Sequence, residues 1–257
     1  METSFVSAID RQQQILQLVE TNRRLSVAEI CQTFSVSEAT ARRDLEVLAA
    51  EGRLQRVHGG AIPLQKASPE APMLQRQSEQ SGDKARIGQA AAALVADGET
   101  VFLGSGTTVL EVARLLRERR LTVITNSLPV INTFAGLENI SLIALGGMLR
   151  DSELSFIGHL TEQALAEVRA DKVILGTFAL SPEHGLTHDY LPETMTDRAI
   201  LKAGRTVIVA ADHTKFGRQA TALLAPIESI HVLVTDRETP AEFIDSCRVR
   251  GIQVIVA

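Results

Sequence analysis

The chain of 257 residues has little aromatic character, with no tryptophan, one tyrosine and 4% aromatic residues in all. Proteins that bind RNA or single strands stack bases on aromatic side chains, so this class of binding is not expected. Cysteine is also scarce. Cys31 and Cys247 lack CxxC spacing and have no clustered histidines nearby. We therefore expect no disulfide framework, no metal site and no cofactor.

Long hydrophobic runs are absent as well. No segment approaches the roughly 18 apolar residues of a membrane span, and the N-terminus, with Asp10 and Arg11, lacks the apolar stretch of a signal peptide. We therefore expect a cytoplasmic protein without a membrane partner. Hydrophobic residues nevertheless make up 45% of the chain, which is enough for a packed core, and the length allows two domains.

The chain also lacks the positive charge that is typical of DNA-binding proteins, since its net charge is −5. Residues 10–61 contain seven arginines, no lysine and seven acidic residues, so this segment is neutral. The acidic excess lies in the larger C-terminal part. Any DNA contact made by residues 10–61 must depend on individually placed arginines and not on a broad positive field.

Residues 36–45 are typical of the turn and recognition helix of a helix-turn-helix. Ser37 can cap the helix, and Ala41, Leu45 and Leu48 form one apolar stripe at helical spacing. A small side chain, a hydroxyl and two arginines fall on the opposite face, which suits a DNA major groove.

Two further helices are expected before this one. The first covers residues 10–21, and the second begins at Ser26, with Glu29 three residues later as a capping box. The recognition helix is expected to end near Glu51, with Gly52 as its stop.

Residues 53–60 follow, in which Leu54 and Val57 can anchor a two-stranded wing that presents Arg56 and His58. An ordinary exposed hairpin would show the same pattern. The predicted DNA contacts are Ser37, Glu38, Ala39, Thr40, Arg42, Arg43, Arg56 and His58.

The composition changes after the wing. Residues 62–80 are rich in proline, glutamine and serine and are interpreted as a linker between a DNA-binding domain, 1–61, and a second domain, 81–257. In the second domain apolar strands alternate with helices, which predicts an α/β fold with a mainly parallel sheet. The expected strands are 100–103, 122–125, 140–145, 172–175, 206–210, 231–235 and 253–256.

Ligands of open α/β sheets bind beyond the carboxyl ends of the strands. After the first expected strand, glycines and hydroxyls precede a helix, an arrangement that can hold a phosphate, although a tight turn would look the same. Arg150 and Lys215 follow later strands and can neutralise an anion. The predicted site for a small anionic polyol is Gly104, Ser105, Gly106, Thr107, Thr108, Thr125, Asn126, Gly146, Gly147, Arg150, Asp212 and Lys215. His188 and Asp189 are further candidates for its lining.

Both halves resemble the DeoR/GlpR family of bacterial regulators of sugar metabolism. The N-terminal resemblance rests on Arg11, Ile15, Leu25, Val27, Phe34, Val36–Ser37, Thr40, Arg42–Leu45, Leu48, Gly52, Leu54 and Arg56–Ala61. The C-terminal resemblance rests on Gly106–Thr108, Thr125–Asn126, Gly146–Gly147, Gly158, Gly185–Thr187 and Asp212–Gly217. The resemblance of the two halves together implies a winged helix-turn-helix joined to a sensor domain of the ribose-5-phosphate isomerase-like fold. The chain departs from the family at Gly104, where an acidic residue is usual, and at Thr177–Leu180, where a glycine is expected.

The resemblance implies a repressor of a carbohydrate catabolic operon that responds to a phosphorylated sugar. Helix-turn-helix proteins bind palindromic operator DNA as dimers, so we expect a homodimer or homotetramer. Two other hypotheses stay open. Asp212, His213 and Lys215 have acid–base chemistry suited to a sugar-phosphate isomerase fused to a DNA-binding module, but no second acidic group is clearly paired with them, so no catalytic residue is assigned and no enzyme is expected. The second domain could also serve only for dimerisation.

Overall fold

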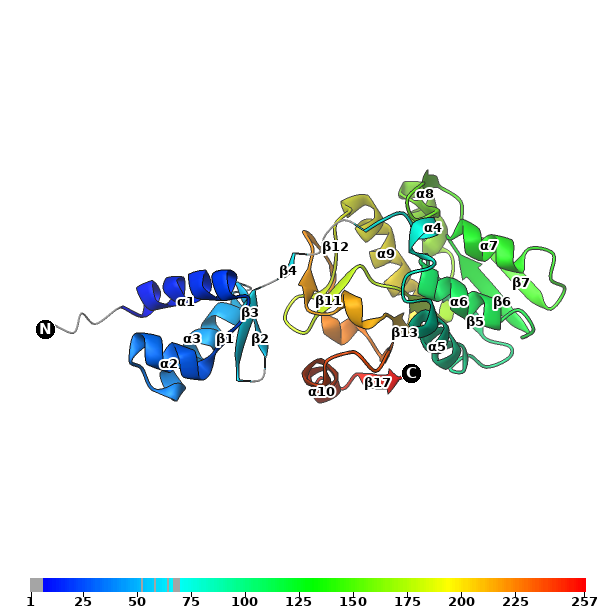
Figure 1. The fold of residues 1–257 in the computed structure, drawn as a ribbon. Helices are drawn as coiled ribbons and strands as arrows, with labels where there is room; N and C mark the ends of the chain where they lie inside the picture. Colours follow the sequence, from blue (N-terminus) through cyan, green and yellow to red (C-terminus); the bar gives the residue numbers. More distant parts are fainter. Residues whose placement is uncertain (1–6, 52, 58, 64, 67–69) are drawn as a thin grey trace, which may run out of the picture. The chain divides into compact units, whose positions relative to one another are not determined.

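The computed structural model describes residues 7–51, 53–57, 59–63, 65–66 and 70–257 (Figure 1). The chain divides into two compact units, Met1–Lys66 and Ala67–Ala257. Within the described residues, no helix is long and apolar enough to cross a membrane.

The first unit consists of three helices and a small antiparallel sheet with strand order β1-β3-β2. Its elements are α1 (Ala8–Asn22), β1 (Leu25–Ser26), α2 (Val27–Phe34), α3 (Glu38–Ala50), β2 (Leu54–Val57), β3 (Gly60–Pro63) and β4 (Gln65–Lys66). The predicted capping box is confirmed, because the Ser26 side chain accepts a hydrogen bond from the Glu29 amide and Glu29 accepts one from the Ser26 amide. The predicted cap of α3 is confirmed too, since the Ser37 side chain accepts a hydrogen bond from the Thr40 amide. The predicted stop at Gly52 lies outside the described residues.

The core of the first unit joins one stripe from each helix to the sheet. Ala41, Leu45 and Leu48, the predicted stripe of α3, are fully buried there. Gly60 lies so close to the backbone of Leu25 and Ser26 that a Cβ at this position would clash with it. The two strands β2 and β3 are therefore held against the helices as the predicted wing.

The second unit is built on a seven-stranded sheet in which every neighbouring pair is parallel (Figure 1). The strand order is β17-β16-β13-β10-β5-β6-β7. All seven predicted strands are confirmed, as β5 (Thr100–Leu103), β6 (Leu121–Thr125), β7 (Ile140–Ala144), β10 (Ala170–Leu175), β13 (Gly204–Ala210), β16 (Val232–Thr235) and β17 (Gln253–Val256).

Helices cover both faces of this sheet, as its apolar strands require. Val101 and Leu103 of β5 pack on the side of α5, α6 and α7, and Phe102 between them packs on the side of α8 and α9. The helices are α4 (Met73–Arg76), α5 (Ser81–Ala92), α6 (Thr107–Leu115), α7 (Leu128–Phe134), α8 (His159–Ala166), α9 (Leu191–Ala203) and α10 (Ala241–Val249). The smaller elements are β8 (Met148–Arg150), β9 (Ser155–Ile157), β11 (Ala179–Ser181), β12 (Gly185–His188), η1 (His213–Lys215), β14 (Arg218–Gln219), β15 (Ala222–Ala225) and η2 (Ile227–Ser229).

The structure corrects the predicted linker 62–80. Its first two residues belong to β3, and the division between the two units falls after Lys66. Near its other end, Met73 and Arg76 of α4 are buried in the second unit, and the Met73 amide donates to the Ser152 carbonyl at 2.7 Å. The prolines of this segment indicated a linker. The burial of Met73 and Arg76 instead makes α4 part of the second unit.

Candidate functional site

The predicted DNA contacts of α3 lie on its exposed face. Glu38, Ala39, Arg42 and Arg43 are exposed and Thr40 is half-buried, whereas the apolar stripe faces the core. Arg42 pairs with Glu38 one turn earlier at 3.0 Å. No ion pair of Arg43 is found among the described residues, so its guanidinium is available to a partner.

The wing contributes one described arginine to the same region. Arg56 of β2 is exposed, and its Nη1 lies 3.0 Å from Oε1 of Glu46 on α3. This contact ties the wing to the recognition helix. The other predicted wing contact, His58, lies outside the described residues.

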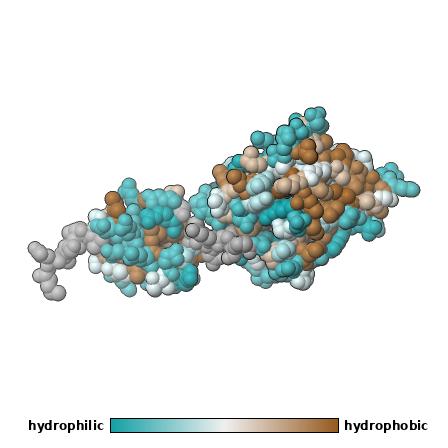
Figure 2. Space-filling view, turned by 90° about the horizontal axis from the view of Figure 1, so that it is seen from above, coloured by the Kyte–Doolittle hydropathy of each residue, from teal (hydrophilic) through white to brown (hydrophobic). Residues whose placement is uncertain are grey.

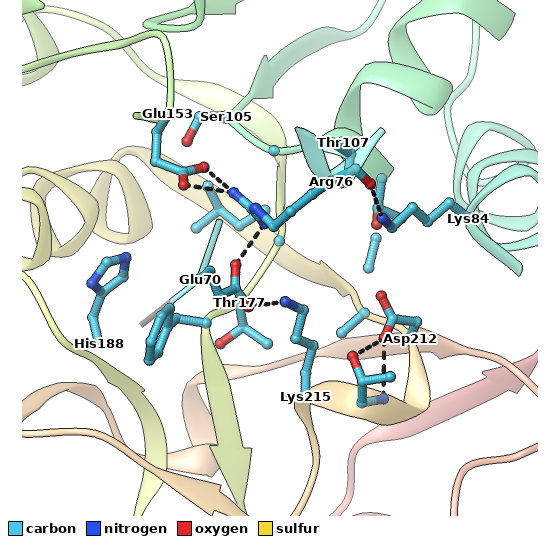
Figure 3. Close-up of a pocket in the computed structure, with 18 of the residues that line it drawn as sticks. Glu70, Arg76, Lys84, Ser105, Thr107, Glu153, Thr177, His188, Asp212 and Lys215 are labelled. Carbon is cyan, nitrogen blue, oxygen red and sulfur yellow. Dashed lines mark hydrogen bonds and ion pairs between the residues drawn. The ribbon is translucent and has the colours of Figure 1, made fainter. Parts of the chain in front are cut away.

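The second unit contains a cavity of about 520 Å³ at the carboxyl ends of β5, β10 and β13 (Figure 3). Its lining begins where these strands end, at Ser105, Gly176 and Ala210. The edge of the sheet is therefore the one at which ligands of open α/β folds bind.

The cavity brings together seven of the twelve predicted ligand-binding residues. These are Ser105, Gly106, Thr107, Thr108, Arg150, Asp212 and Lys215. The first four form the start of α6, whose free amide groups and dipole favour an anion. Gly106 has a φ of 113°, which a side chain would rarely allow, so the tight turn into the helix depends on this glycine.

The other five predicted residues, Gly104, Thr125, Asn126, Gly146 and Gly147, do not line this cavity. The Thr125 hydroxyl donates to the Leu103 carbonyl at 2.6 Å, and the Asn126 amide donates to the Phe156 carbonyl at 2.9 Å. Both side chains thus join strands and loops within the protein. Thr125 ends β6 and Asn126 follows it, near one edge of the sheet, whereas the cavity lies over central strands.

Close packing accounts for two of the three glycines among these five, Gly104 and Gly147. A Cβ at Gly104 would clash with the side chain of Leu175, and a Cβ at Gly147 would clash with Thr161. The Gly146 carbonyl accepts a hydrogen bond from the same threonine at 2.8 Å. Leu175, which does line the cavity, occupies the space beside Gly104 where the family resemblance led us to expect an acidic side chain.

Several lining residues were not predicted. Three of them are basic: Arg76 from the segment interpreted as a linker, Lys84 from α5 and Arg218 from β14. Arg76 lies between two carboxylates, 2.6 Å from Glu70 and 2.5 Å from Glu153 (Figure 3). Lys84 donates to the Arg76 carbonyl at 2.7 Å. Burial lowers the pKa of the Lys84 ammonium, and the nearby Asp212 carboxylate raises it in part.

A sequence signal for Lys84 did exist. Lys84, Ile87 and Ala91 share the buried face of α5 at spacings of three and four. A lysine within an otherwise apolar stripe indicates a charge that the fold holds inside, so this pattern marks a candidate site residue.

His188, Glu193 and Arg150 meet elsewhere in the cavity lining. Arg150 forms an ion pair with Glu193, whose carboxylate lies 3.1 Å from Nε2 of His188. Nδ1 of His188 accepts a hydrogen bond from the Tyr190 amide at 3.0 Å, which places the imidazole proton on Nε2. The ring stacks on Phe178 at 5.1 Å, and burial lowers the pKa of His188 to about 4 despite the adjacent Asp189 carboxylate. The imidazole is therefore neutral at pH 7. His188 and Asp189, the two further candidates from the sequence, both line the cavity.

Burial shifts the pKa of two carboxyl groups that line the cavity, Glu153 and Asp197. The pKa of Glu153 is raised by burial although the Arg76 guanidinium opposes the shift. Burial also raises the pKa of Asp197 to about 7. Besides its cations, the cavity therefore offers acidic and imidazole groups that exchange hydrogen bonds with hydroxyls.

Asp83, His213 and Asp236 offer ligand atoms within 4.8 Å of one another and are the group in the described part of the chain that could hold a metal ion. The Asp236 carboxylate already accepts hydrogen bonds from the amides of His213 at 2.7 Å and Glu238 at 2.8 Å. These bonds anchor η1 and explain the burial of the aspartate without a metal.

Comparison with known protein families assigns both units. Residues 11–67 match the DeoR-like helix-turn-helix domain, and residues 79–237 match the DeoR C terminal sensor domain. The chain belongs to the DeoR family. This membership confirms the resemblance and the α/β fold class with an N-terminal helix-turn-helix.

Relatives of this DeoR-family chain align over nearly its whole length. The transcriptional repressor AccR of Agrobacterium fabrum is 36% identical over 91% of the chain and 92% of its own length. The glycerol-3-phosphate regulon repressor of Escherichia coli is 35% identical over 88% of the chain and 90% of its own length. Among solved structures, ribose 5-phosphate isomerase A of Neisseria gonorrhoeae aligns at 14% identity over 52% of each chain, with a TM-score of 0.39.

Proposed function

We propose that this DeoR-family member is a transcriptional repressor of a carbohydrate operon, and that a phosphorylated sugar in the cavity of the second unit controls its affinity for operator DNA. The cavity carries the proposal, because its lining joins a helix N-terminus and several cations to acidic and imidazole groups. The first set suits a phosphate and the second suits sugar hydroxyls.

DNA binding is proposed for the exposed face of α3 and for the wing. Among the described residues Arg43 has no ion pair, so its guanidinium can make the bidentate contact to guanine. Arg42 and Arg56 pair with exposed carboxylates, Glu38 and Glu46. The remaining proposed contacts are Ser37, Glu38, Ala39, Thr40 and His58. Named repressors among the relatives support this assignment.

We propose a homodimer or homotetramer that acts in the cytoplasm, where operator DNA lies. Two recognition helices one DNA turn apart require two copies of the chain. Figure 2 shows hydrophobic residues gathered on one face of the second unit. Large exposed apolar side chains in this unit include Ile143, Met148, Leu149 and Leu160, and an exposed apolar patch is typical of a protein interface.

An isomerase activity is not supported by the groups that the sequence suggested for it. The Asp212 carboxylate caps η1 by accepting from the Thr214 amide at 3.0 Å, and Nδ1 of His213 lies 3.1 Å from Asp236. Lys215 is paired with Glu70. All three side chains thus have structural partners, which favours a sensor that binds a sugar phosphate without converting it.

The test measures the affinity of the protein for a DNA duplex by fluorescence anisotropy. The duplex is first selected from a pool of randomised DNA sequences by binding to the protein. A panel of sugar phosphates is added, with the unphosphorylated sugars as controls. We expect at least one phosphorylated sugar to change the dissociation constant of the duplex tenfold or more, while its unphosphorylated counterpart does not. Failure to select any duplex would contradict DNA binding, and an affinity that no sugar phosphate alters would contradict the effector.

Two variants sharpen this test. Lys215→Met removes a cavity cation and should abolish the response of DNA affinity to the active sugar phosphate. Lys202→Met removes an exposed lysine of α9 outside the cavity lining and should behave like the unmodified protein. An equal response in both variants would remove Lys215 from the phosphate site.

A further inference from the structure

The cavity already contains an anionic group of the protein itself, the carboxylate of Glu70. We propose that Glu70 occupies the place of the effector's phosphate, so that an incoming phosphate must displace it from Lys215 and thereby frees the chain that leads to the first unit. This inference rests on the proposed function, because it takes the cavity to be an anion site.

The contacts of Glu70 resemble those expected of a bound anion. Its carboxylate pairs with Lys215, and its Oε2 lies 2.6 Å from Nη1 of Arg76 (Figure 3). The side chains of Glu70 and Lys215 are each 14% exposed, so the pair is largely shielded from water. In such surroundings, a cation needs a partner, and Lys215 can exchange one anion for another more easily than it can remain unpaired.

A phosphate monoester is the better partner for this position. It carries nearly two negative charges at pH 7 and three acceptor oxygens, whereas a carboxylate carries one charge and two oxygens. It can reach Lys215 together with the hydroxyl and amide groups at the start of α6, which line the same cavity. A neutral sugar cannot compete in this way, so displacement of Glu70 would select for phosphorylated effectors.

Among the described residues, the departure of Glu70 leaves Arg76 still paired. Arg76 keeps Glu153 as a partner at 2.5 Å and also donates from Nε to the Ala71 carbonyl at 2.7 Å. Arg76 can therefore stay in place when Glu70 moves. The exchange therefore involves one carboxylate, Glu70, and one lysine, Lys215.

Glu70 lies near the start of the second unit, close in the chain to the first unit, so its displacement can affect the first unit. Glu70 follows Lys66, the last residue of the first unit, by four positions. Three residues beyond it, Met73 is fully buried and its amide is bonded to Ser152. Displacement of Glu70 therefore releases the chain at Glu70, while α4 remains anchored through Met73. A ligand in the second unit can in this way alter the freedom of the DNA-binding unit.

The experiment titrates the full-length protein with inorganic phosphate by calorimetry at constant ionic strength. Glu70→Gln is compared with Glu79→Gln, which removes another lining carboxylate and the same charge. In the described residues, no ion pair joins Glu79 to Lys215. We expect Glu70→Gln to bind phosphate about tenfold more tightly than the unmodified protein and Glu79→Gln to change the affinity less than threefold. Equal effects of the two substitutions would overturn the proposal, because they would reflect charge alone.

Hydrogen exchange of the unmodified protein gives a second measurement that does not depend on a variant. Phosphate should speed exchange in the peptide that contains Glu70 and leave α4 unchanged; slower or unaltered exchange in that peptide would overturn the proposal. A third outcome separates the two proposals. If the unmodified protein binds phosphate, Lys215→Met does not, and Glu70→Gln has the affinity of the unmodified protein, the proposed anion site stands and the role of Glu70 is wrong. If no variant binds phosphate, both fall.

Discussion

Arg42 of the first unit and Arg76 of the second unit serve their units in opposite ways. On α3, Arg42 is 60% exposed and its partner Glu38 is 70% exposed, whereas in the cavity Arg76 is 11% exposed and its partner Glu153 is 14% exposed. Exposed pairs contribute little to stability and open at little cost, so their arginines can turn to DNA. Buried pairs keep a fixed geometry, which a small ligand can recognise. The same residue type therefore gives an adaptable surface in one unit and a rigid pocket in the other.

The largest expected effect comes from removing a buried arginine. Arg76→Met should lower the free energy of unfolding by about 3–5 kcal/mol, because Glu70 and Glu153 lose their shared partner in a shielded site. Urea denaturation followed by circular dichroism measures this change. A loss below about 1 kcal/mol would mean that the pocket pairs are as adaptable as those on α3.

Removing an exposed arginine should affect DNA binding instead. Arg43→Ala should weaken operator affinity by about 1–3 kcal/mol if Arg43 makes a bidentate base contact, with stability nearly unchanged. Arg24→Ala, which removes an exposed arginine outside α3, is the matched control. Equal losses in both variants would show that only the total charge matters.

The neutral imidazole of the cavity predicts a pH dependence of stability. The pKa of His188 is lowered from 6.5 to about 4. As the pH falls, the unfolded chain therefore binds a proton at His188 before the folded chain does. The stability that the neutral ring contributes is thus fully present above pH 6.5 and is lost as the pH approaches 4. Between pH 7.5 and 5, the free energy of unfolding of the unmodified protein should fall by about 1–2 kcal/mol more than that of His188→Gln. Parallel urea curves at the two pH values measure the difference, and identical losses would contradict a buried neutral ring.

The smallest effect is expected on the surface. Arg42→Gln breaks the exposed pair with Glu38 and should change the free energy of unfolding by no more than about 0.5 kcal/mol. The same urea titration applies. A loss comparable to that of Arg76→Met would erase the distinction between the two units.

Local patterns were sufficient for the first unit and for the sheet of the second. The stripe of Ala41, Leu45 and Leu48 faces the core, and the Ser26 capping box forms. These features depend on neighbours within a few residues, so the sequence displays them directly. The seven strands were predictable for a similar reason, since strands buried on both faces appear as apolar runs.

Strand-end reasoning located the edge of the sheet but not the strands over which the cavity lies. It included Thr125 and Asn126, whose side chains bond to backbone carbonyls, and it omitted Arg76 and Lys84. The strand order, which places β10 between β5 and β13, brings residues together that are more than seventy positions apart. No local pattern reports such an order.

By itself, the sequence determined the helix-turn-helix, the parallel strands and the family, because periodicity, caps and motifs are local properties of the chain. Only the tertiary structure decided which charges are buried. It set the exposed Arg42 apart from the enclosed Arg76 and brought Glu70 to Lys215 across 145 positions. The physical reason is that desolvation and ion pairing depend on all the groups around a charge, and packing of distant segments assembles those groups.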